Sequence, residues 1–152
     1  MKKLLLLIVL LFVQGTSWAR LSEVQVYRLL LKHEIQHPRI VMKQILLESA
    51  DLTSYSTRHR NNILGLMKST KYSMKHRRFK SVEDCIKWYK KHIQNRYHGG
   101  DYYTFLRKAR YCPEKTYISR VKRRKIRTNT EILNNLEQEQ LCLRLQQNSE
   151  QI

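Results

Sequence analysis

One segment, residues 38–53 (PRIVMKQILLESADLT), limits how this chain can fold more than any other. Pro38 suits the first turn of a helix. A helix that starts there and advances about 100° per residue is apolar nearly all the way round. Such a helix is stable only when other elements cover it on most sides. The pattern therefore predicts a buried central helix, around which the rest of the domain packs.

Glu48 is the last helical carboxylate of this segment, and the helical repeat places it over Val41 and Ile45 of the preceding turns. Burial raises the pKa of a carboxyl group, because the charged form loses the most hydration. A carboxyl group with a raised pKa that faces a polar loop can act as a general acid. The other interpretation is that Glu48 is the last solvated residue of a core helix, and its position alone does not exclude this.

The first 19 residues are predicted to be a secretory signal peptide. Lys2 and Lys3 precede a run of ten apolar residues over 4–13, and Ala19 is a small residue before the expected cleavage at Arg20. Ten apolar residues are too few to cross a bilayer. We therefore expect a periplasmic or secreted protein with no membrane span after signal cleavage.

The expected mature protein is strongly basic. Cleavage removes two of the 30 basic residues and none of the 12 acidic ones, which leaves a formal charge of +16. This charge favours an anionic partner: a nucleic acid, an acidic membrane surface or a polyanionic wall polymer. Export argues against a nucleic acid. The basic run over residues 120–127 is expected to be exposed and to serve attraction to the partner and not catalysis.

The three cysteines, Cys85, Cys112 and Cys142, have no metal-ligand spacing, and an odd number allows at most one internal disulfide. Cys85 falls among apolar helix positions and is predicted to be a small core residue. We expect neither a metal nor another cofactor.

Helical periodicity predicts further helices over residues 23–36, 82–97, 101–108 and 114–124, with a loop and two or three short strands between 51 and 81. Gly65, inside an apolar run, suggests a close backbone approach. Trp88 lies off the apolar stripe of its helix, and is either a packing residue or an exposed ring available to a sugar. Residues 128–152 are expected to form a polar C-terminal appendage outside the core, with leucines spaced loosely as in a helix.

Five short motifs together resemble the glucosaminidase family of bacterial peptidoglycan hydrolases, of the flagellar and autolysin type. They are HPRIV at 37–41, QILLES at 44–49, NNILGL at 61–66, FKSV at 79–82, and RYC at 110–112 with Tyr117 six residues after Tyr111. The resemblance covers residues 21–122. It implies a lysozyme-like α+β fold, mostly helical with a small β-lobe, for a domain over residues 20–127.

The resemblance also implies a function for the residues that match the motifs. Glu48 would be the general acid of an enzyme that cleaves β-1,4 bonds after N-acetylglucosamine in peptidoglycan glycan strands. Asn61, Asn62 and Tyr111 would bind the substrate. The sequence differs from the family pattern at Ala50, where glycine is usual.

The second catalytic carboxylate is not obvious. No Asp or Glu lies between Asp51 and Glu83, so the strand region cannot supply one. Asp51 is the local candidate, although it equally fits a loop residue held by backbone amides. A single acid, helped by the N-acetyl group of the substrate or by a positioned water, is the other option. The alternative function is a non-catalytic, basic wall-binding protein that keeps the fold. The oligomeric state is not predicted.

Overall fold

The computed structural model describes residues 20–149, so the predicted signal peptide lies outside the described residues. Within this range the chain forms seven α-helices, one 3-10 helix and one two-stranded sheet. The fold is mostly helical α+β with a small β-lobe, which confirms the predicted fold class. No helix within residues 20–149 is long and apolar enough to cross a membrane.

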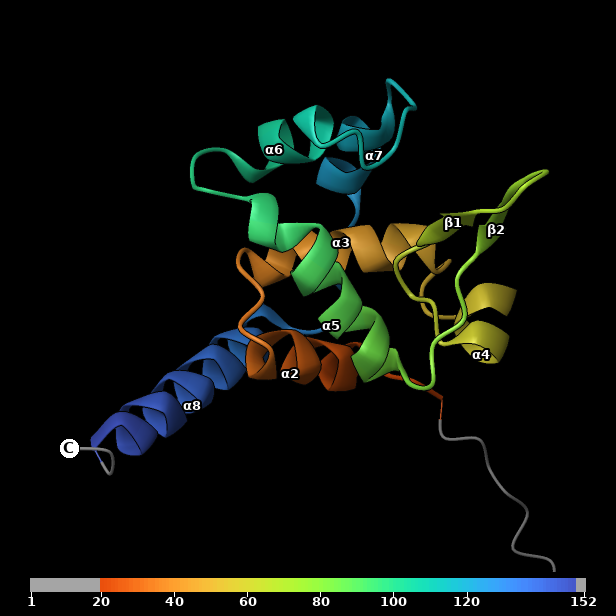
Figure 1. Cartoon of the computed structure of the whole chain (residues 1–152). Coiled ribbons are helices and arrows are strands. Elements are labelled where there is room, and N and C mark those ends of the chain that lie inside the picture. The colour runs from red at the N-terminus through yellow and green to blue at the C-terminus, as the bar shows by residue number, and fades with distance from the viewer. Residues whose placement is uncertain (1–19, 150–152) are drawn as a thin grey trace, which may run out of the picture.

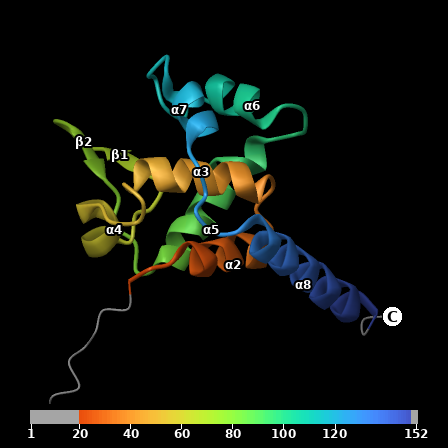
Figure 2. The same cartoon turned by 180° about the vertical axis from the view of Figure 1, so that it is seen from behind.

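The elements follow in the order α2 (Glu23–Lys32), α3 (Pro38–Glu48), α4 (Tyr55–Arg60), β1 (Met67–Ser69), β2 (Met74–His76), α5 (Val82–His92), η1 (Gln94–Arg96), α6 (Tyr102–Lys108), α7 (Tyr117–Arg123) and α8 (Thr130–Ser149). Helix α3 crosses the middle of the body, between α2 and α5 on one side and α6 and α7 on the other (Figure 1). The strands and α4 lie at the carboxyl end of α3. Seen from behind, α8 leaves the body on the side away from the strands (Figure 2).

Helix α3 is the centre of the core, as its composition predicts. Pro38 lies in its first turn, and the side chains of Val41, Met42, Ile45 and Leu46 have no solvent exposure. Each such burial contributes about 1.5–3 kcal/mol. The helix packs against both α2 and α7, which fixes the position of its carboxyl end within the body.

Side-chain caps explain where three of the helices begin. Ser22 and Gln25 form a reciprocal capping box at the start of α2. Ser81 and Asp101 accept backbone hydrogen bonds at the start of α5 and α6. A cap of this kind contributes about 1 kcal/mol. The predicted starts of these helices are confirmed.

Two helices end earlier than predicted. Helix α2 stops at Lys32, because Glu34 just beyond its end adopts a left-handed φ angle of 52°. Helix α5 stops at His92 and is followed by η1. The apolar residues beyond these ends, Ile35 and Tyr97, are nevertheless buried. Because they are apolar, the sequence pattern predicted helices that continue through them, but both residues enter the core from turns.

The segment between 51 and 81 contains a helix that the sequence did not predict. Helix α4 buries only Thr57 among its six residues and begins at the Ser54 cap, so it has no apolar stripe to reveal it. Two or three short strands were predicted here, and the described residues form two, an antiparallel pair with Met67 opposite His76. All six strand residues are exposed.

The C-terminal helix α8 is partly core. Leu133 and Leu136 are buried in the main cluster, and Glu137 accepts hydrogen bonds from Tyr27 and Arg39. The expectation that the C-terminal segment lies outside the core is therefore wrong for the first turns of α8. Its distal turns extend away from the body (Figures 1 and 2).

The three cysteines are free thiols. Cys85 is fully buried, as predicted, and burial raises the pKa of its thiol to about 12. It therefore stays protonated and acts as a small apolar residue.

Candidate active site

Glu48 is the last residue of α3, and its carboxyl group lies against the backbone of Gly65. Gly65 has a φ of +62°, and a Cβ atom at this position would lie 2.4 Å from Oε2 of Glu48. A side chain at this position would be strained by the backbone conformation and would force the carboxyl group of Glu48 to move. The close backbone approach predicted at Gly65 is confirmed, and the group approached is Glu48.

The chain turns sharply just after Glu48. Ser49 Oγ donates to the carbonyl of Ile45 at 2.6 Å and accepts from the amide of Leu52 at 2.9 Å. Ala50, Asp51 and Leu52 have consecutive left-handed φ angles of 48°, 56° and 65°. This turn ends α3 at Glu48.

The carboxyl group of Glu48 is half-buried, and burial is the main cause that raises its pKa. A hydrogen bond from Tyr117 and the charge of Arg120 oppose the rise, and the charge of Glu114 adds to it. Glu114 and Arg120 form an ion pair with each other at 2.8 Å, so their effects on Glu48 partly cancel. The net result is a carboxyl group that holds its proton to a higher pH than a solvated glutamate.

Tyr111 borders the same site. Its hydroxyl donates to the carbonyl of Leu64 at 2.5 Å, next to Gly65. Its ring packs on that of Tyr117, with centroids 5.8 Å apart. Burial raises the pKa of Tyr111 well above its ordinary value, and the charge of Glu48 contributes to this rise. The structure therefore brings Tyr111 to Glu48, while contact with a substrate stays a prediction.

The two asparagines hold the β-lobe together. Asn62 is fully buried. Its amide donates to the carbonyls of Leu66 and Arg77 at 2.8 and 3.0 Å, and its oxygen accepts from the amide of Leu66 at 2.9 Å. Asn61 donates to two backbone carbonyls ahead of α5, at 3.1 and 3.0 Å. These bonds engage both amides within the protein, and substrate binding by either residue stays a prediction.

Asp51 lies in the turn after Glu48, and its carboxylate forms ion pairs with Arg124 and Arg127. The distance to Nη2 of Arg127 is 2.9 Å. These contacts tie the end of α3 to the segment after α7. They also engage part of the basic run over residues 120–127, which was expected to be free at the surface.

Sequence reasoning did not single out Gln44, Glu114, Tyr117 or Arg120 as site residues. Gln44 and Tyr117 belong to the motifs that carry the family resemblance, so these motifs could have indicated that both residues lie at the site. Glu114 and Arg120 belong to no local pattern. They reach Glu48 only because α7 packs on α3.

Trp88 is half-buried and makes contacts within the protein. Its ring stacks on that of His92, with centroids 4.2 Å apart, and the guanidinium group of Arg77 lies 4.4 Å from its centroid. These contacts favour the packing interpretation over a free sugar platform.

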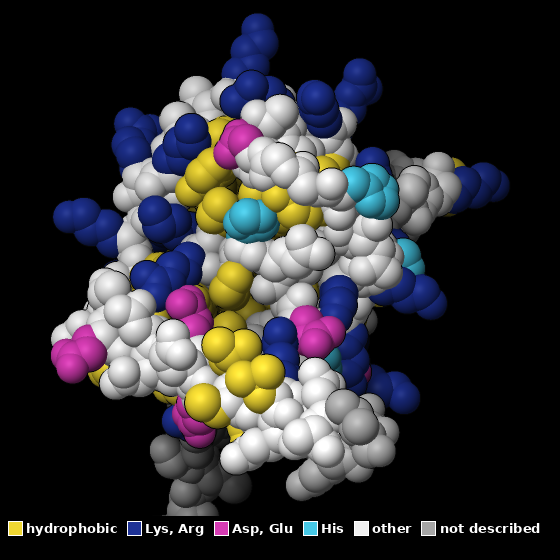
Figure 3. Space-filling view, turned by 90° about the vertical axis from the view of Figure 1, so that its left-hand side faces the viewer, with side chains coloured by type: hydrophobic (Ala, Val, Ile, Leu, Met, Phe, Trp, Pro, Cys, Tyr) yellow, Lys and Arg dark blue, Asp and Glu magenta, His cyan; other side chains and the backbone are white. Residues whose placement is uncertain are grey.

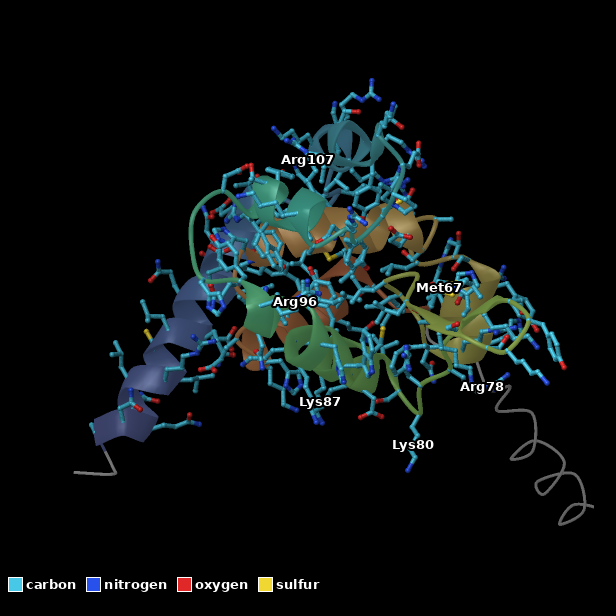
Figure 4. The ribbon with its side chains drawn as sticks, turned by 45° about the horizontal axis from the view of Figure 1, so that its top comes forward. Met67, Arg78, Lys80, Lys87, Arg96 and Arg107 are labelled. Carbon is cyan, nitrogen blue, oxygen red and sulfur yellow. The ribbon has the colours of Figure 1, made fainter. Side chains whose placement is uncertain are left out.

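Positive charge is distributed over many elements. Figure 4 labels exposed basic side chains from the segment before α5, from α5, from η1 and from α6: Arg78, Lys80, Lys87, Arg96 and Arg107. On the face shown in Figure 3, Lys and Arg side chains project around the rim and acidic ones are few. An anionic polymer would therefore be attracted by the molecule as a whole, beyond the run at 120–127.

Comparison with known proteins gives one family. The sequence model of the glucosaminidase family, described as mannosyl-glycoprotein endo-beta-N-acetylglucosaminidase, matches residues 24–130. No curated protein and no solved structure matches the chain. The matched range includes Glu48, Gly65, Tyr111 and Tyr117 and ends where α8 begins.

Proposed function

The chain belongs to the glucosaminidase family, and we propose on this basis that it is an exported glycoside hydrolase. Its substrate is peptidoglycan, it cleaves the β-1,4 bond after N-acetylglucosamine, and Glu48 is the general acid. The observation that carries the proposal is the setting of Glu48: half-buried at the end of the central helix, beneath Gly65, with a raised pKa.

The step assigned to Glu48 is proton donation to the glycosidic oxygen as the bond to the leaving sugar breaks. A solvated glutamate is almost fully ionised at neutral pH and has no proton to give. Desolvation of Glu48 counteracts this. General acid catalysis of this kind contributes about 10²–10⁴-fold to a rate.

Ion pairs around the site bear on which group could assist Glu48 in catalysis. Asp51 is engaged by Arg124 and Arg127, which favours a role in holding the end of α3. Glu114 is engaged by Arg120. These pairs support a single-acid mechanism, in which the N-acetyl group of the substrate or a water attacks the sugar carbon.

A gel with embedded peptidoglycan tests the proposal. The purified protein should clear the gel, and the Glu48→Gln variant should lose at least about 100-fold of this activity, because it keeps the shape of the side chain but lacks the transferable proton. Glu139→Gln, on the exposed face of α8, is the matched control and should clear at the parent rate. Clearing by Glu48→Gln at the parent rate would refute the assignment.

The alternative is a non-catalytic wall-binding protein. It is favoured by the lack of any Asp or Glu between Asp51 and Glu83, which leaves the β-lobe without a carboxylate. Sedimentation with insoluble peptidoglycan separates the two functions. Binding by the parent protein without release of soluble fragments would establish the alternative, whereas fragment release that depends on Glu48 would exclude it.

A further inference from the structure

A continuous series of buried hydrogen bonds begins at the turn before α3, passes through residues of η1, α6, α5 and α3, and ends in α7. We call it the Tyr–Gln network, and its members are Gln94, Tyr102, Tyr89, Gln44 and Tyr117. Gln44 has no solvent exposure, and the other four are at most 4% exposed. Because an unpaired buried polar group is costly, each amide and hydroxyl in such a place has to find a partner.

The backbone fixes the orientation of the network at Gln94. Its Oε1 accepts from the amide of Gln36 at 3.0 Å, and its Nε2 donates to the carbonyl of Gln36 at 2.8 Å. A backbone amide can only donate and a backbone carbonyl can only accept. The amide of Gln94 therefore has one orientation, in which Nε2 also donates to the hydroxyl oxygen of Tyr102 at 3.2 Å.

This orientation is passed from group to group, because each phenol has a single proton. Tyr102 lies 2.7 Å from the hydroxyl of Tyr89 and donates to it. Tyr89 in turn donates to Oε1 of Gln44 at 3.0 Å. The Nε2 group of Gln44 is left to donate to the hydroxyl oxygen of Tyr117 at 3.3 Å. The one proton of Tyr117 is then left for another acceptor, and the neighbouring carboxyl group of Glu48, whose pKa the Tyr117 hydroxyl lowers, is the group that we infer to accept it.

We propose that the Tyr–Gln network positions the carboxyl group of Glu48 by holding the hydroxyl of Tyr117 as a donor to it. The network acts from a distance, since Tyr89 and Tyr102 reach Glu48 only through Gln44 and Tyr117. Tyr117, Gln44 and Tyr89 are thus positioning residues, and their effect on catalysis rests on the proposed role of Glu48 as general acid.

Loss of the Tyr117 hydroxyl as a hydrogen-bond donor should destabilise the ionised form of Glu48 and so raise its pKa. The Tyr117 hydrogen bond lowers the pKa of Glu48 against the larger rise from burial. Two other groups shift the pKa of this carboxyl group: Arg120 lowers it and Glu114 raises it. Tyr111 is also close, and the charge of Glu48 raises the pKa of its hydroxyl. None of these three residues is substituted in the variants of the network, so a change in the pKa of Glu48 would report the network.

The test is the pKa of Glu48, measured by carboxyl 13C chemical shift in protein labelled at glutamate, with the signal assigned by its loss in Glu48→Gln. Tyr117→Phe should raise this pKa the most. Tyr89→Phe should raise it less, because the amide of Gln44 can then turn and offer Oε1 to Tyr117. In Tyr117→Phe protein, a second change of Tyr89→Phe should add nothing, because the two act in series.

Tyr27→Phe is the matched control, since Tyr27 is also fully buried but its hydroxyl bonds to Glu137. It should leave the pKa of Glu48 at the parent value. An unchanged pKa in folded Tyr89→Phe, or an equal rise in Tyr27→Phe, would overturn the proposal. These outcomes do not depend on activity. If Glu48 titrates as expected but the pH profile of cleavage does not follow it, the proposed function fails and the network stands.

A measurement on the parent protein covers the case in which Tyr89→Phe does not fold. Nuclear Overhauser effects from the side-chain amide protons of Gln44 should reach the ring of Tyr117 and be weaker to the ring of Tyr89. The reverse pattern would place Oε1 of Gln44 toward Tyr117, and would overturn the proposal without any substitution.

Discussion

At the scale of single residues, the raised pKa of Glu48 affects stability as well as chemistry. The folded state holds the proton of Glu48 more tightly than the unfolded chain does, because burial penalises the carboxylate. Proton binding that favours the folded state stabilises it at low pH, and this contribution is lost as pH rises from the ordinary glutamate value toward the raised one. Above that range, the ionised and half-buried Glu48 costs stability.

Glu48→Gln should therefore gain stability relative to the parent protein as pH rises. The difference in free energy of unfolding should grow from about the ordinary pKa of 4.5 upward and become constant above the raised pKa, because glutamine does not ionise. Urea unfolding at a series of pH values measures this. A difference that is independent of pH, or that shrinks as pH rises, would show that burial does not raise the pKa of Glu48.

Helical periodicity and glycine chemistry were sufficient to predict the positions of Glu48 and Gly65, because both depend on local sequence. Tyr117, Arg120 and Glu114 act on Glu48 from a distant part of the chain. Their places follow from how α7 packs on α3, which no local pattern encodes. Asn61 and Asn62 were singled out from the sequence because their residue type suits sugar binding. Their side-chain hydrogen bonds to backbone carbonyls depend on the fold and could not be predicted.

At the scale of elements, the chain leaves α3 through a left-handed residue at the position where the resemblance to the family implies glycine. Ala50 occupies that position with a φ of +48°. An L-residue in the left-handed region costs about 1–2 kcal/mol, a penalty that glycine does not have. The chain compensates with the hydrogen bonds of Ser49 and the ion pairs of Asp51, which together hold the turn.

Ala50→Gly should stabilise the protein by up to about 1 kcal/mol, since relief of the left-handed strain outweighs the added freedom of the unfolded chain. Ala109→Gly is the matched control. Ala109 caps α6 with a φ of −68°, so glycine there should cost about 0.5–1 kcal/mol. Thermal unfolding of the three proteins gives the comparison, and a lower melting temperature for Ala50→Gly would contradict the account of this turn.

The helices that could be predicted, α2, α3, α5, α6 and α7, all bury apolar side chains, and side-chain caps mark the starts of α2, α5 and α6. Helix α4 could not, because it buries almost nothing. The distinction between core and surface within α8 was also not predictable, since its leucines look alike in sequence while Leu133 and Leu136 are the ones that are buried.

At the scale of the whole molecule, charge decides how the protein meets an anionic polymer. The basic run at 120–127 is partly engaged, through Arg120, Arg124 and Arg127. Among the described residues, Arg123 and Lys125 are exposed and form no ion pair, and the same holds for Arg78 and Lys80 near the β-lobe. Exposed charges of this kind act through a field that salt screens over about 10 Å at 0.1 M.

Reversal of Arg123 and Lys125 to glutamate should weaken sedimentation with peptidoglycan, and the weakening should fade as salt rises. Reversal of Arg78 and Lys80 should weaken it to a similar degree, because the attraction comes from distributed charge. Cleavage of a short neutral chito-oligosaccharide should be unchanged by the reversal at 123 and 125. Binding of the parent protein that ignores salt would contradict the electrostatic account, and equal loss on the neutral substrate would place these residues at the active site.

The most direct test of the central claim is the identity of the new reducing ends released from purified peptidoglycan. Borohydride reduction followed by acid hydrolysis distinguishes N-acetylglucosamine ends from N-acetylmuramic acid ends. The parent protein should release fragments that end in N-acetylglucosamine, in an amount that increases with time and falls at least about 100-fold in Glu48→Gln. Ends in N-acetylmuramic acid, or new ends that form equally well with Glu48→Gln, would contradict the account.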